Sequence, residues 1–409
     1  MDASQTVDRV ARNAYGRLIA YLAARTGDVA AAEDSLAAAF LSALQTWPVA
    51  GVPERPEAWL LTTARRRQID AARRQQVQTE AMRRVYESTV QVAEEQDSFP
   101  DERLKLLFTC AHPAIDEAVR TPLMLQAVLG LDAGRIANAF ITKPGTMGQR
   151  LSRAKFKIRE AKISFEIPSS RELAGRLTAV LSAIYAAYGT GWNDVEGADA
   201  RGPGLAEEAI ELGEMLVLLM PSEPEVHGLL ALMLYCQARR SARRGFRGEY
   251  VPLAEQDPGL WSLEMIDRAE AALAAAASFG RIGRFQLEAA IQSAHCQRRF
   301  GQPTDWDAIA GLYFGLVRIC PTLGAITATA AALGEARGAL VAWEYLQQIP
   351  PDAVRSYQPY WALLGHLLAR LGLVEDAREA YSTAIGLSHD SACRSFLQGR
   401  LELVSGSSA

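Results

Sequence analysis

The sequence has little of what marks a secreted or membrane-spanning protein. Its 409 residues contain no apolar run of about eighteen residues, the length that a membrane-spanning helix needs. Residues 1–16 lack a basic segment followed by an apolar one, so no secretory signal is expected. The five cysteines are scattered and none forms a CxxC pair, which favours reduced thiols over a disulfide framework. These absences predict a cytoplasmic protein without a membrane segment.

The sequence motifs of common enzymes are absent too. The chain has no Walker loop, no GxGxxG, no HExxH and no GxSxG. The five histidines lie far apart. Neither His295 beside Cys296 nor His112 near Cys110 has the further ligands that a metal site needs. We therefore predict a protein that is not an enzyme and binds no cofactor or metal.

Strand patterns are nearly absent. Alternating runs of β-branched residues are missing, while Ala, Leu, Arg and Glu recur at helical spacing. The apolar content of 49% and the charged content of 22% are ordinary for a globular protein. The pattern predicts an all-α fold, and the length allows two to four domains.

The charge is unevenly distributed along a chain whose net charge is -4. Residues 1–170 carry 23 Lys and Arg against 20 Asp and Glu, a net charge of +3. Residues 171–409 carry a net charge of -7. A basic front half joined to an acidic back half indicates that only the front half meets a polyanion.

The stretch RLSRAKFKIR, residues 150–159, is the most basic helix expected. Its apolar residues recur at steps of four, three and four and form one buried stripe: Met147, Leu151, Ala154 and Ile158. A short helix near Ile136 and a tight break, ITKPGT, precede it, and Pro144 suits the first helical position. This layout is typical of a helix-turn-helix, whose second helix enters the major groove of DNA.

The side chains of this helix have different predicted roles. Arg150 or Arg153 would read guanine, and Gln149 would read adenine. Cations later in the helix would contact phosphates instead: Lys155, Lys157 and Arg159. The alternative is a surface helix whose cations are only solvated.

A second basic helix is expected over residues 59–76, WLLTTARRRQIDAARRQQ, which has five arginines against Asp70. The connector before it, WPVAGVPERPEAW, holds two tryptophans and three prolines. Arginines with nearby aromatics bind single-stranded DNA through phosphate contacts and base stacking. The alternative is that Trp47 and Trp59 belong to the core.

The last part of the chain shows a repeat. One copy follows the 34-residue tetratricopeptide (TPR) pattern of large and small residues: Trp361, Leu364, Gly365, Leu368, Gly372, Ala377, Tyr381 and Ala384. Partial copies precede it: Ala339, Trp343, Leu346 and Pro351, then Ala310, Phe314, Val317 and Pro321. An irregular TPR-like solenoid is the prediction.

Two composition shifts divide the chain. Residues 86–102 carry six acidic residues and no basic ones, and EIPSSREL near 166–173 marks a second boundary. We predict a helical domain, an acidic linker, a helix-turn-helix domain, a helical extension and TPR-like repeats, at 1–80, 81–100, 101–166, 167–300 and 301–409.

These segments, in this order, resemble the extracytoplasmic-function (ECF) sigma factors of bacterial RNA polymerase. The resemblance rests first on AAEDSLAAAFLSALQTW and RPEAWLLTTARRRQIDAARR, followed by the acidic linker and the helix-turn-helix. PSEPEVHGLLALML, then LAEQDPGLW and the repeats, are similar to an ECF subgroup with a large helical C-terminal extension. The resemblance covers nearly the whole chain.

The resemblance implies two sigma-type domains with assigned residues. In the first, σ2, residues of one helix would bind the polymerase core: Glu33, Asp34, Leu36 and Phe40. Arginines of σ2 would bind the minus-ten element: Arg65, Arg66, Arg67, Arg73 and Arg74. In the second, σ4, residues would bind the minus-thirty-five element: Thr146, Gln149, Arg150, Arg153 and Lys157. The implied partners are the β′ coiled coil and β flap of the polymerase core, promoter DNA, and a regulatory protein on the TPR-like part.

The sequence departs from the family pattern at two places. Ala37 and Ala38 stand where the family has Gln and an acidic residue, and residues 189–192 read GTGW instead of Asn-Glu-Gly-Tyr. One hypothesis is a weak polymerase binder that phosphorylation of Ser35 would strengthen. The alternative is a tolerated substitution. A TPR-type adaptor with a degenerate front, or a one-component helix-turn-helix regulator, are the other functions left open.

Overall fold

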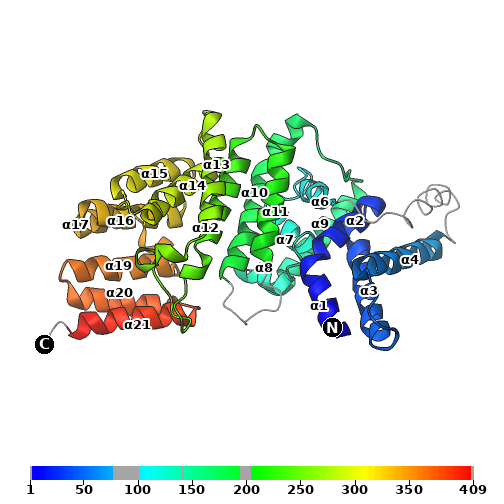
Figure 1. The fold of residues 1–409 in the computed structure, drawn as a ribbon, viewed down its shortest axis with the longest axis horizontal. Coiled ribbons are helices and arrows are strands. Elements are labelled where there is room, and N and C mark those ends of the chain that lie inside the picture. The colour runs from blue at the N-terminus through cyan, green and yellow to red at the C-terminus, as the bar shows by residue number, and fades with distance from the viewer. Residues whose placement is uncertain (1, 77–100, 141, 194–203, 407–409) are drawn as a thin grey trace. The chain divides into compact units, whose positions relative to one another are not determined.

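The computed structural model describes residues 2–76, 101–140, 142–193 and 204–406, which form helices and no β-strand (Figure 1). One isolated bridge pairs Arg244 with Tyr250. The prediction of an all-α fold is therefore confirmed. The chain forms two compact units, Met1–Met215 and Leu216–Ala409. The predicted acidic linker, residues 81–100, lies outside the described residues.

Four helices form the first part of unit 1: α1 (Ala3–Asn13), α2 (Tyr15–Thr26), α3 (Val29–Ala50) and α4 (Pro56–Gln76). Helix α2 ends at Gly27, whose φ of 68° is the left-handed conformation that glycine adopts freely. Asp28 then starts α3, because its carboxylate accepts a hydrogen bond from the backbone N–H of Ala31 at 3.1 Å. The core between these helices is apolar: Leu18, Ile19, Leu22, Leu36 and Leu60.

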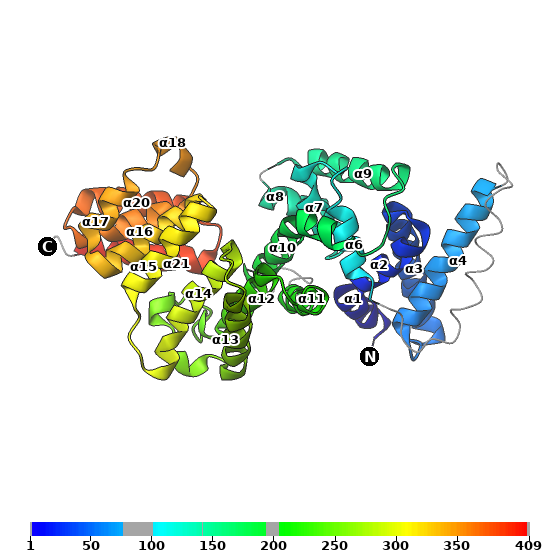
Figure 2. The same ribbon diagram turned by 90° about the horizontal axis from the view of Figure 1, so that it is seen from above.

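Four shorter helices follow: α6 (Arg103–Cys110), α7 (Glu117–Ala127), α8 (Ala133–Ala139) and α9 (Pro144–Glu160). Pro144 occupies the first turn of α9, as predicted. The predicted stripe of α9 is buried in full: Met147, Leu151, Ala154 and Ile158. Figure 2 shows this group beside α2 and α3, with which α6, α7 and α9 are in contact.

Unit 1 continues into the region after the predicted second boundary. Helix α10 (Ser170–Asn193) packs against α6 and α7, and α11 (Leu205–Leu219) follows. The guanidinium of the buried Arg176 on α10 donates to the carbonyl oxygen of Phe108 at 3.3 Å. The first helices of the extension therefore form one compact body with the two front groups of helices.

The boundary between the units falls at Leu216, near the end of α11, and the first whole helices of unit 2 are α12 (Pro224–Ala238), α13 (Leu263–Ser278) and α14 (Arg284–Cys296). The carboxylate of Glu225, in the first turn of α12, accepts hydrogen bonds from the backbone N–H groups of Phe285 and Gln286 at 3.0 and 3.1 Å. A Cβ at Gly228 would lie 2.6 Å from the backbone nitrogen of Gln286. The segment PSEPEVHG thus fixes the close packing of α12 on the start of α14.

The rest of unit 2 is a succession of helices: α15 (Trp306–Ile319), α16 (Leu323–Arg337), α17 (Ala339–Leu346), α18 (Pro351–Val354), α19 (Gln358–Arg370), α20 (Val374–Leu387) and α21 (Ser391–Gly406). Helices α19, α20 and α21 lie side by side (Figure 1). A Cβ at Gly365 would lie 2.9 Å from the ring of Tyr381. A small residue at this position therefore permits the close approach of α19 and α20.

Candidate nucleic-acid interface

The face of α9 opposite its buried stripe is polar and exposed. It carries the residues that the sequence assigned to DNA: Thr146, Gln149, Arg150, Arg153 and Lys157. Their exposure follows from the helical period, because the buried stripe fixes which side chains face solvent. Phe156 is exposed as well, with the Arg159 guanidinium 5.0 Å from its ring centroid.

Three of these cations border one pocket of about 400 Å³ between α9 and the start of α7. It is lined by Ala114, Ile115, Asp116, Ala118, Val119, Arg150, Arg153, Ala154 and Lys157. Within the described residues none of the three cations has an ion-pair partner. The three cations outnumber the single carboxylate of the lining, Asp116, which caps α7, so the pocket favours an anionic group such as a phosphate.

Helix α4 presents a second group of cations. Arg66, Arg67 and Arg73 are exposed, Arg65 is half-buried, and the Arg67 guanidinium donates to the Ser42 hydroxyl at 2.8 Å. The side chain of Arg74 lies outside the described part of the chain.

The two tryptophans near α4 belong to the fold. Trp47 is buried, and Trp59 packs edge-on against it with ring centroids 5.4 Å apart. In this structure Trp47 is a core residue and is not available to stack on bases.

Lys155 corrects one sequence prediction. Its side chain was expected to contact phosphate, but it is 7% exposed and its ammonium lies 2.5 Å from Glu33 Oε2 on α3. One turn later, the Arg159 guanidinium lies 3.4 Å from Asp28 Oδ2. Two of the three predicted phosphate contacts of α9 therefore bind the N-terminal end of α3 in this structure.

Burial governs the chemistry around this ion pair. It raises the pKa of Glu33, although Lys155 opposes the rise. The second carboxylate oxygen of Glu33 is buried without a hydrogen-bond partner among the described residues. Burial also raises the pKa of the neighbouring Cys110 thiol, so this cysteine is an unreactive core residue.

The residues exposed on α3 differ in part from those that the sequence assigned to polymerase binding. Leu36 is fully buried, so its assignment to polymerase is wrong and it belongs to the core. Asp34 is exposed and Phe40 is half-buried. The sequence assignment missed Leu41 and Leu44, which are 62% and 43% exposed on the same side as Asp34 and could have been found from helical spacing.

The hypothesis of phosphorylation at Ser35 is also contradicted. The side chain of Ser35 is buried, and its hydroxyl donates to the carbonyl oxygen of Ala32 at 2.9 Å. A modifying enzyme would have to unfold this part of α3 to reach the hydroxyl.

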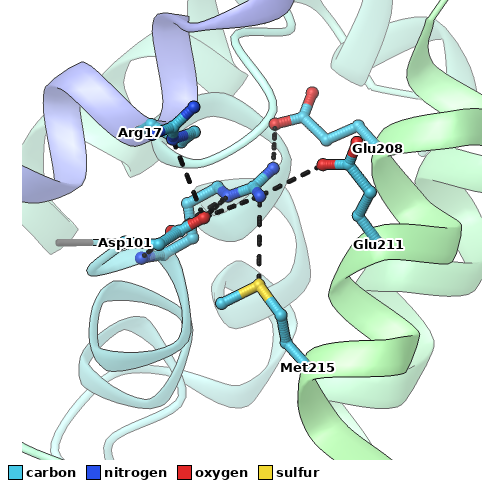
Figure 3. Close-up of polar contacts among 6 residues, drawn as sticks. Arg17, Asp101, Glu208, Glu211 and Met215 are labelled. Atoms are coloured by element: carbon cyan, nitrogen blue, oxygen red, sulfur yellow. Dashed lines mark hydrogen bonds and ion pairs between the residues drawn. The ribbon is translucent and has the colours of Figure 1, made fainter. Parts of the chain in front are cut away.

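A buried arginine joins the segments of unit 1 (Figure 3). The Arg103 guanidinium lies 2.8 Å from Asp101, 3.1 Å from Glu208 and 3.2 Å from Glu211. Asp101 also lies 3.9 Å from Arg17 on α2. Arg103 therefore links α6 to two carboxylates of α11, 105 and 108 residues further along the chain.

The pKa values of Arg103 and Glu208 in this cluster are both shifted, for different reasons. Burial lowers the pKa of Arg103, but its hydrogen bonds and charge interactions with Asp101 and Glu208 outweigh burial and hold the pKa above its ordinary value. Burial raises the pKa of Glu208 to about 7, although Arg103 opposes the rise. Arg103 thus stays charged, while Glu208 exchanges its proton near neutral pH.

The chain matches two family models over parts of its length and one relative over most of it. Residues 11–77 match the model described as sigma-70 region 2, and residues 176–277 match a family of unknown function, DUF6596. The uncharacterized protein R00370 of Rhizobium meliloti (strain 1021) is 34% identical over 396 residues, which span 95% of this chain and 92% of that protein. The chain belongs to a family of sigma-factor-like proteins. No solved structure matches it.

In the sigma-factor-like protein, the match to region 2 covers three helices, α2, α3 and α4. A sigma-70 region 2 implies the RNA polymerase core and promoter DNA as partners of this part of the chain. The exposed side of α3 and the arginines of α4 lie within the match.

The part of the chain that the structure describes has no group of three His, Cys, Asp or Glu side chains that would hold a metal ion. Nor does any helix in that part have the length and hydropathy of a membrane span. All five cysteines are free thiols.

Proposed function

We propose that this protein is an ECF-type sigma factor that directs RNA polymerase to promoters with minus-ten and minus-thirty-five elements. The observation that supports it most is a single compact unit with one exposed apolar helix face and two separate groups of exposed cations. This combination serves a protein that binds both another protein and DNA. The proposed protein is not an enzyme, and its two interfaces need no cofactor.

Helix α3 provides the proposed contact with the polymerase core, at its β′ coiled coil. Its exposed side runs through Asp34, Ala37, Leu41 and Leu44. Exposed leucines at helical spacing are unfavourable in water and are typical of a surface that a partner covers. Asp34 adds a charge at one end of the stripe, which helps to fix the register of docking.

Helices α4 and α9 provide the proposed DNA contacts. On α4, Arg66, Arg67 and Arg73 would hold the melted minus-ten strand by its phosphates. On α9, Gln149 and Arg153 would read base edges of the minus-thirty-five element, with Thr146 and Arg150 beside them. Lys157, further along, would bind phosphate. In this proposal α8 and α9 are the helix-turn-helix of a σ4 domain, which would also contact the β flap.

The C-terminal helices would regulate this activity. We propose that α15 to α21 form an irregular TPR-like array on which a signalling protein docks. The close approach at Gly365 and Tyr381 supports the TPR-like packing of α19 and α20. The boundaries at about 166 and 300 belong to this proposal.

Reconstituted transcription with purified core polymerase tests the proposal against its two rivals. A transcript that depends on both this chain and a promoter supports a sigma factor. Binding of duplex DNA without transcription supports a one-component regulator. A chain that binds neither core polymerase nor duplex DNA is an adaptor. The adaptor is favoured by the exposed Ala37 and the half-buried Ala38, because alanine lacks the polar contacts that the family makes at these two positions.

A further inference from the structure

Two arginines of unit 2 lie near the C-terminal ends of α12 and α14. Arg239 directly follows α12 and is 6% exposed, and its guanidinium donates to the side-chain oxygen of Gln292. Arg298 lies in the short helix Gln297–Phe300, and its guanidinium donates to the carbonyl oxygens of Leu253 and Gln256 at 2.7 and 3.0 Å. These acceptors are neutral, so they leave both positive charges uncompensated.

Within the described residues no carboxylate forms an ion pair with either arginine. The carboxylates that act on the neighbouring cysteine thiols have partners of their own. Glu288 accepts a hydrogen bond from Arg284 at 2.7 Å, and Glu270 accepts one from the Ser293 hydroxyl at 2.6 Å. A guanidinium keeps its proton in a protein, and a buried charge without a counter-charge is unfavourable. The buried charge of Arg239 therefore favours a bound anion.

Three buried polar atoms in this region have no hydrogen-bond partner among the residues that the structure describes: Arg239 Nε, Trp261 Nε1 and Gln256 Oε1. The three residues are 6%, 3% and 4% exposed. Buried polar groups in proteins are almost always hydrogen-bonded. Two N–H donors and one acceptor are therefore left for a bound molecule.

Contacts between nearby segments bring these residues together. The Arg298 guanidinium lies 5.6 Å from the ring centroid of Trp261 and donates to the backbone of Gln256. The N–H of Ser262, which follows Trp261, donates to the carbonyl oxygen of the residue before Arg239 at 2.9 Å. Trp261 thus links the two segments that carry the arginines.

The buried His295 lies within reach of both positive charges. Burial lowers its pKa, and the charges of Arg239 and Arg298 lower it further, to about 4. The imidazole is therefore neutral at neutral pH. The cluster of Arg239, Gln256, Trp261, His295 and Arg298 then carries two positive charges and no negative one.

We propose that this cluster binds a small molecule through a carboxylate or phosphate group. The Arg239 guanidinium and the Trp261 indole N–H donate to the oxyanion, and Arg298 adds a second positive charge beside it. The side-chain oxygen of Gln256 accepts from a hydroxyl group of the same ligand. The ligand is thus a small acid that also carries a hydroxyl group. The site uses none of the polymerase or DNA contacts proposed for unit 1.

Matched pairs of anions test the site on the full-length protein. Phosphate near pH 6 and lactate carry an anionic group and a hydroxyl, whereas sulfate and acetate carry the anionic group alone. Amide hydrogen exchange is measured in each at equal ionic strength, with chloride as the reference. At ten times its Kd, phosphate or lactate should slow exchange in residues 239–262 about tenfold. Sulfate and acetate should each bind about tenfold more weakly than the matched anion.

Two conservative substitutions and one control locate the binding. Trp261→Phe keeps an aromatic ring and removes the indole N–H, so affinity should fall about tenfold. Gln256→Glu keeps the size of the side chain and supplies a carboxylate beside the arginines, so the anion should no longer bind. Arg318→Gln removes an exposed arginine of unit 2 that has no ion pair in the described part of the chain, and it should bind as wild type does.

The outcomes decide the proposal. Slower exchange in residues 239–262 that Gln256→Glu abolishes and Arg318→Gln retains supports the site, and the stronger of phosphate and lactate identifies the oxyanion. Exchange that is the same in all four anions as in chloride overturns it, since water then satisfies the buried atoms. Equal slowing in wild type and Gln256→Glu also overturns it, because the anion then binds elsewhere. The assay contains no polymerase or DNA, so its result does not depend on the proposed function.

Discussion

At the scale of single residues, charge determines how unit 1 is joined. Arg103, Lys155 and Arg176 are buried cations, and each has an acceptor on another helix. A buried charge is tolerated only when it is paired, so each of these residues fixes the position of two segments at once. Within the described residues, four exposed arginines of α4 and α9 have no such partner, and the proposed function assigns them to DNA: Arg66, Arg73, Arg150 and Arg153.

Glu208 gives the first residue-scale prediction. Its pKa in the folded protein, about 7, lies above its ordinary value of 4.5. Protonated Glu208 therefore favours folding at low pH, and this contribution is lost as pH rises through about 7. Glu208→Gln removes the dependence, so its stability relative to wild type should improve on the order of 2 kcal/mol between pH 5 and pH 8. Urea unfolding at both pH values measures the difference.

Glu211→Gln is the matched control. Glu211 faces the same guanidinium from the same helix, but its side chain is 61% exposed. The free energy of unfolding of Glu211→Gln should change with pH as that of wild type does. If the free energies of unfolding of wild type and Glu208→Gln change with pH in parallel, burial does not raise the pKa of Glu208.

The second residue-scale prediction separates base reading from phosphate binding on α9. Arg153→Ala should lose about 1–3 kcal/mol of discrimination at one base pair of the minus-thirty-five element. Lys157→Ala should weaken binding to all duplexes about equally and reduce the salt slope by about one. Equilibrium binding to a set of single-base variants at three salt concentrations distinguishes them. An Arg153→Ala protein that keeps full discrimination would assign that residue to phosphate.

At the scale of helices, much of α9 could be predicted from its own sequence. The steps between Met147, Leu151, Ala154 and Ile158 gave the buried side, and Pro144 gave the start. The role of Lys155 could not be predicted in this way, because its partner Glu33 lies 122 residues away. The partners of Arg103 could not be predicted either, because helical periodicity indicates which side of a helix is buried but not which charged residue packs against that side.

Helix packing gives an element-scale prediction at Gly228. A Cβ there would lie 2.6 Å from a backbone nitrogen at the start of α14, and backbone cannot move aside as a side-chain end does. Gly228→Ala should therefore destabilise unit 2 by about 2 kcal/mol or more. Gly386→Ala is the control, since open space surrounds that helical position and the substitution should be neutral or stabilising by up to about 1 kcal/mol.

Thermal unfolding of the full-length protein, followed by circular dichroism, compares the two substitutions. Equal melting temperatures for Gly228→Ala and Gly386→Ala would mean that α12 and α14 are not packed as closely as the structure shows.

At the scale of the whole molecule, the chain divides its tasks between its parts. Unit 1 holds the exposed cations of α4 and α9 and the apolar side of α3, while unit 2 is a succession of helices on which we propose that a regulatory protein docks. The charge difference between residues 1–170 and 171–409 predicted only that the front half meets a polyanion, and its boundary at residue 170 does not coincide with the division of the two units at Leu216. It did not indicate that α10 and α11 pack with the front helices, because that depends on Arg103 and Arg176.

We propose above that this protein gives RNA polymerase its promoter specificity. Transcription of genomic DNA fragments by core polymerase, with and without the purified chain, tests it most directly when the 5′ ends of the RNA are sequenced. We expect transcripts that require the chain and start downstream of one shared pair of sequence elements. Start sites that are the same with and without the chain, although it binds core polymerase, would contradict it.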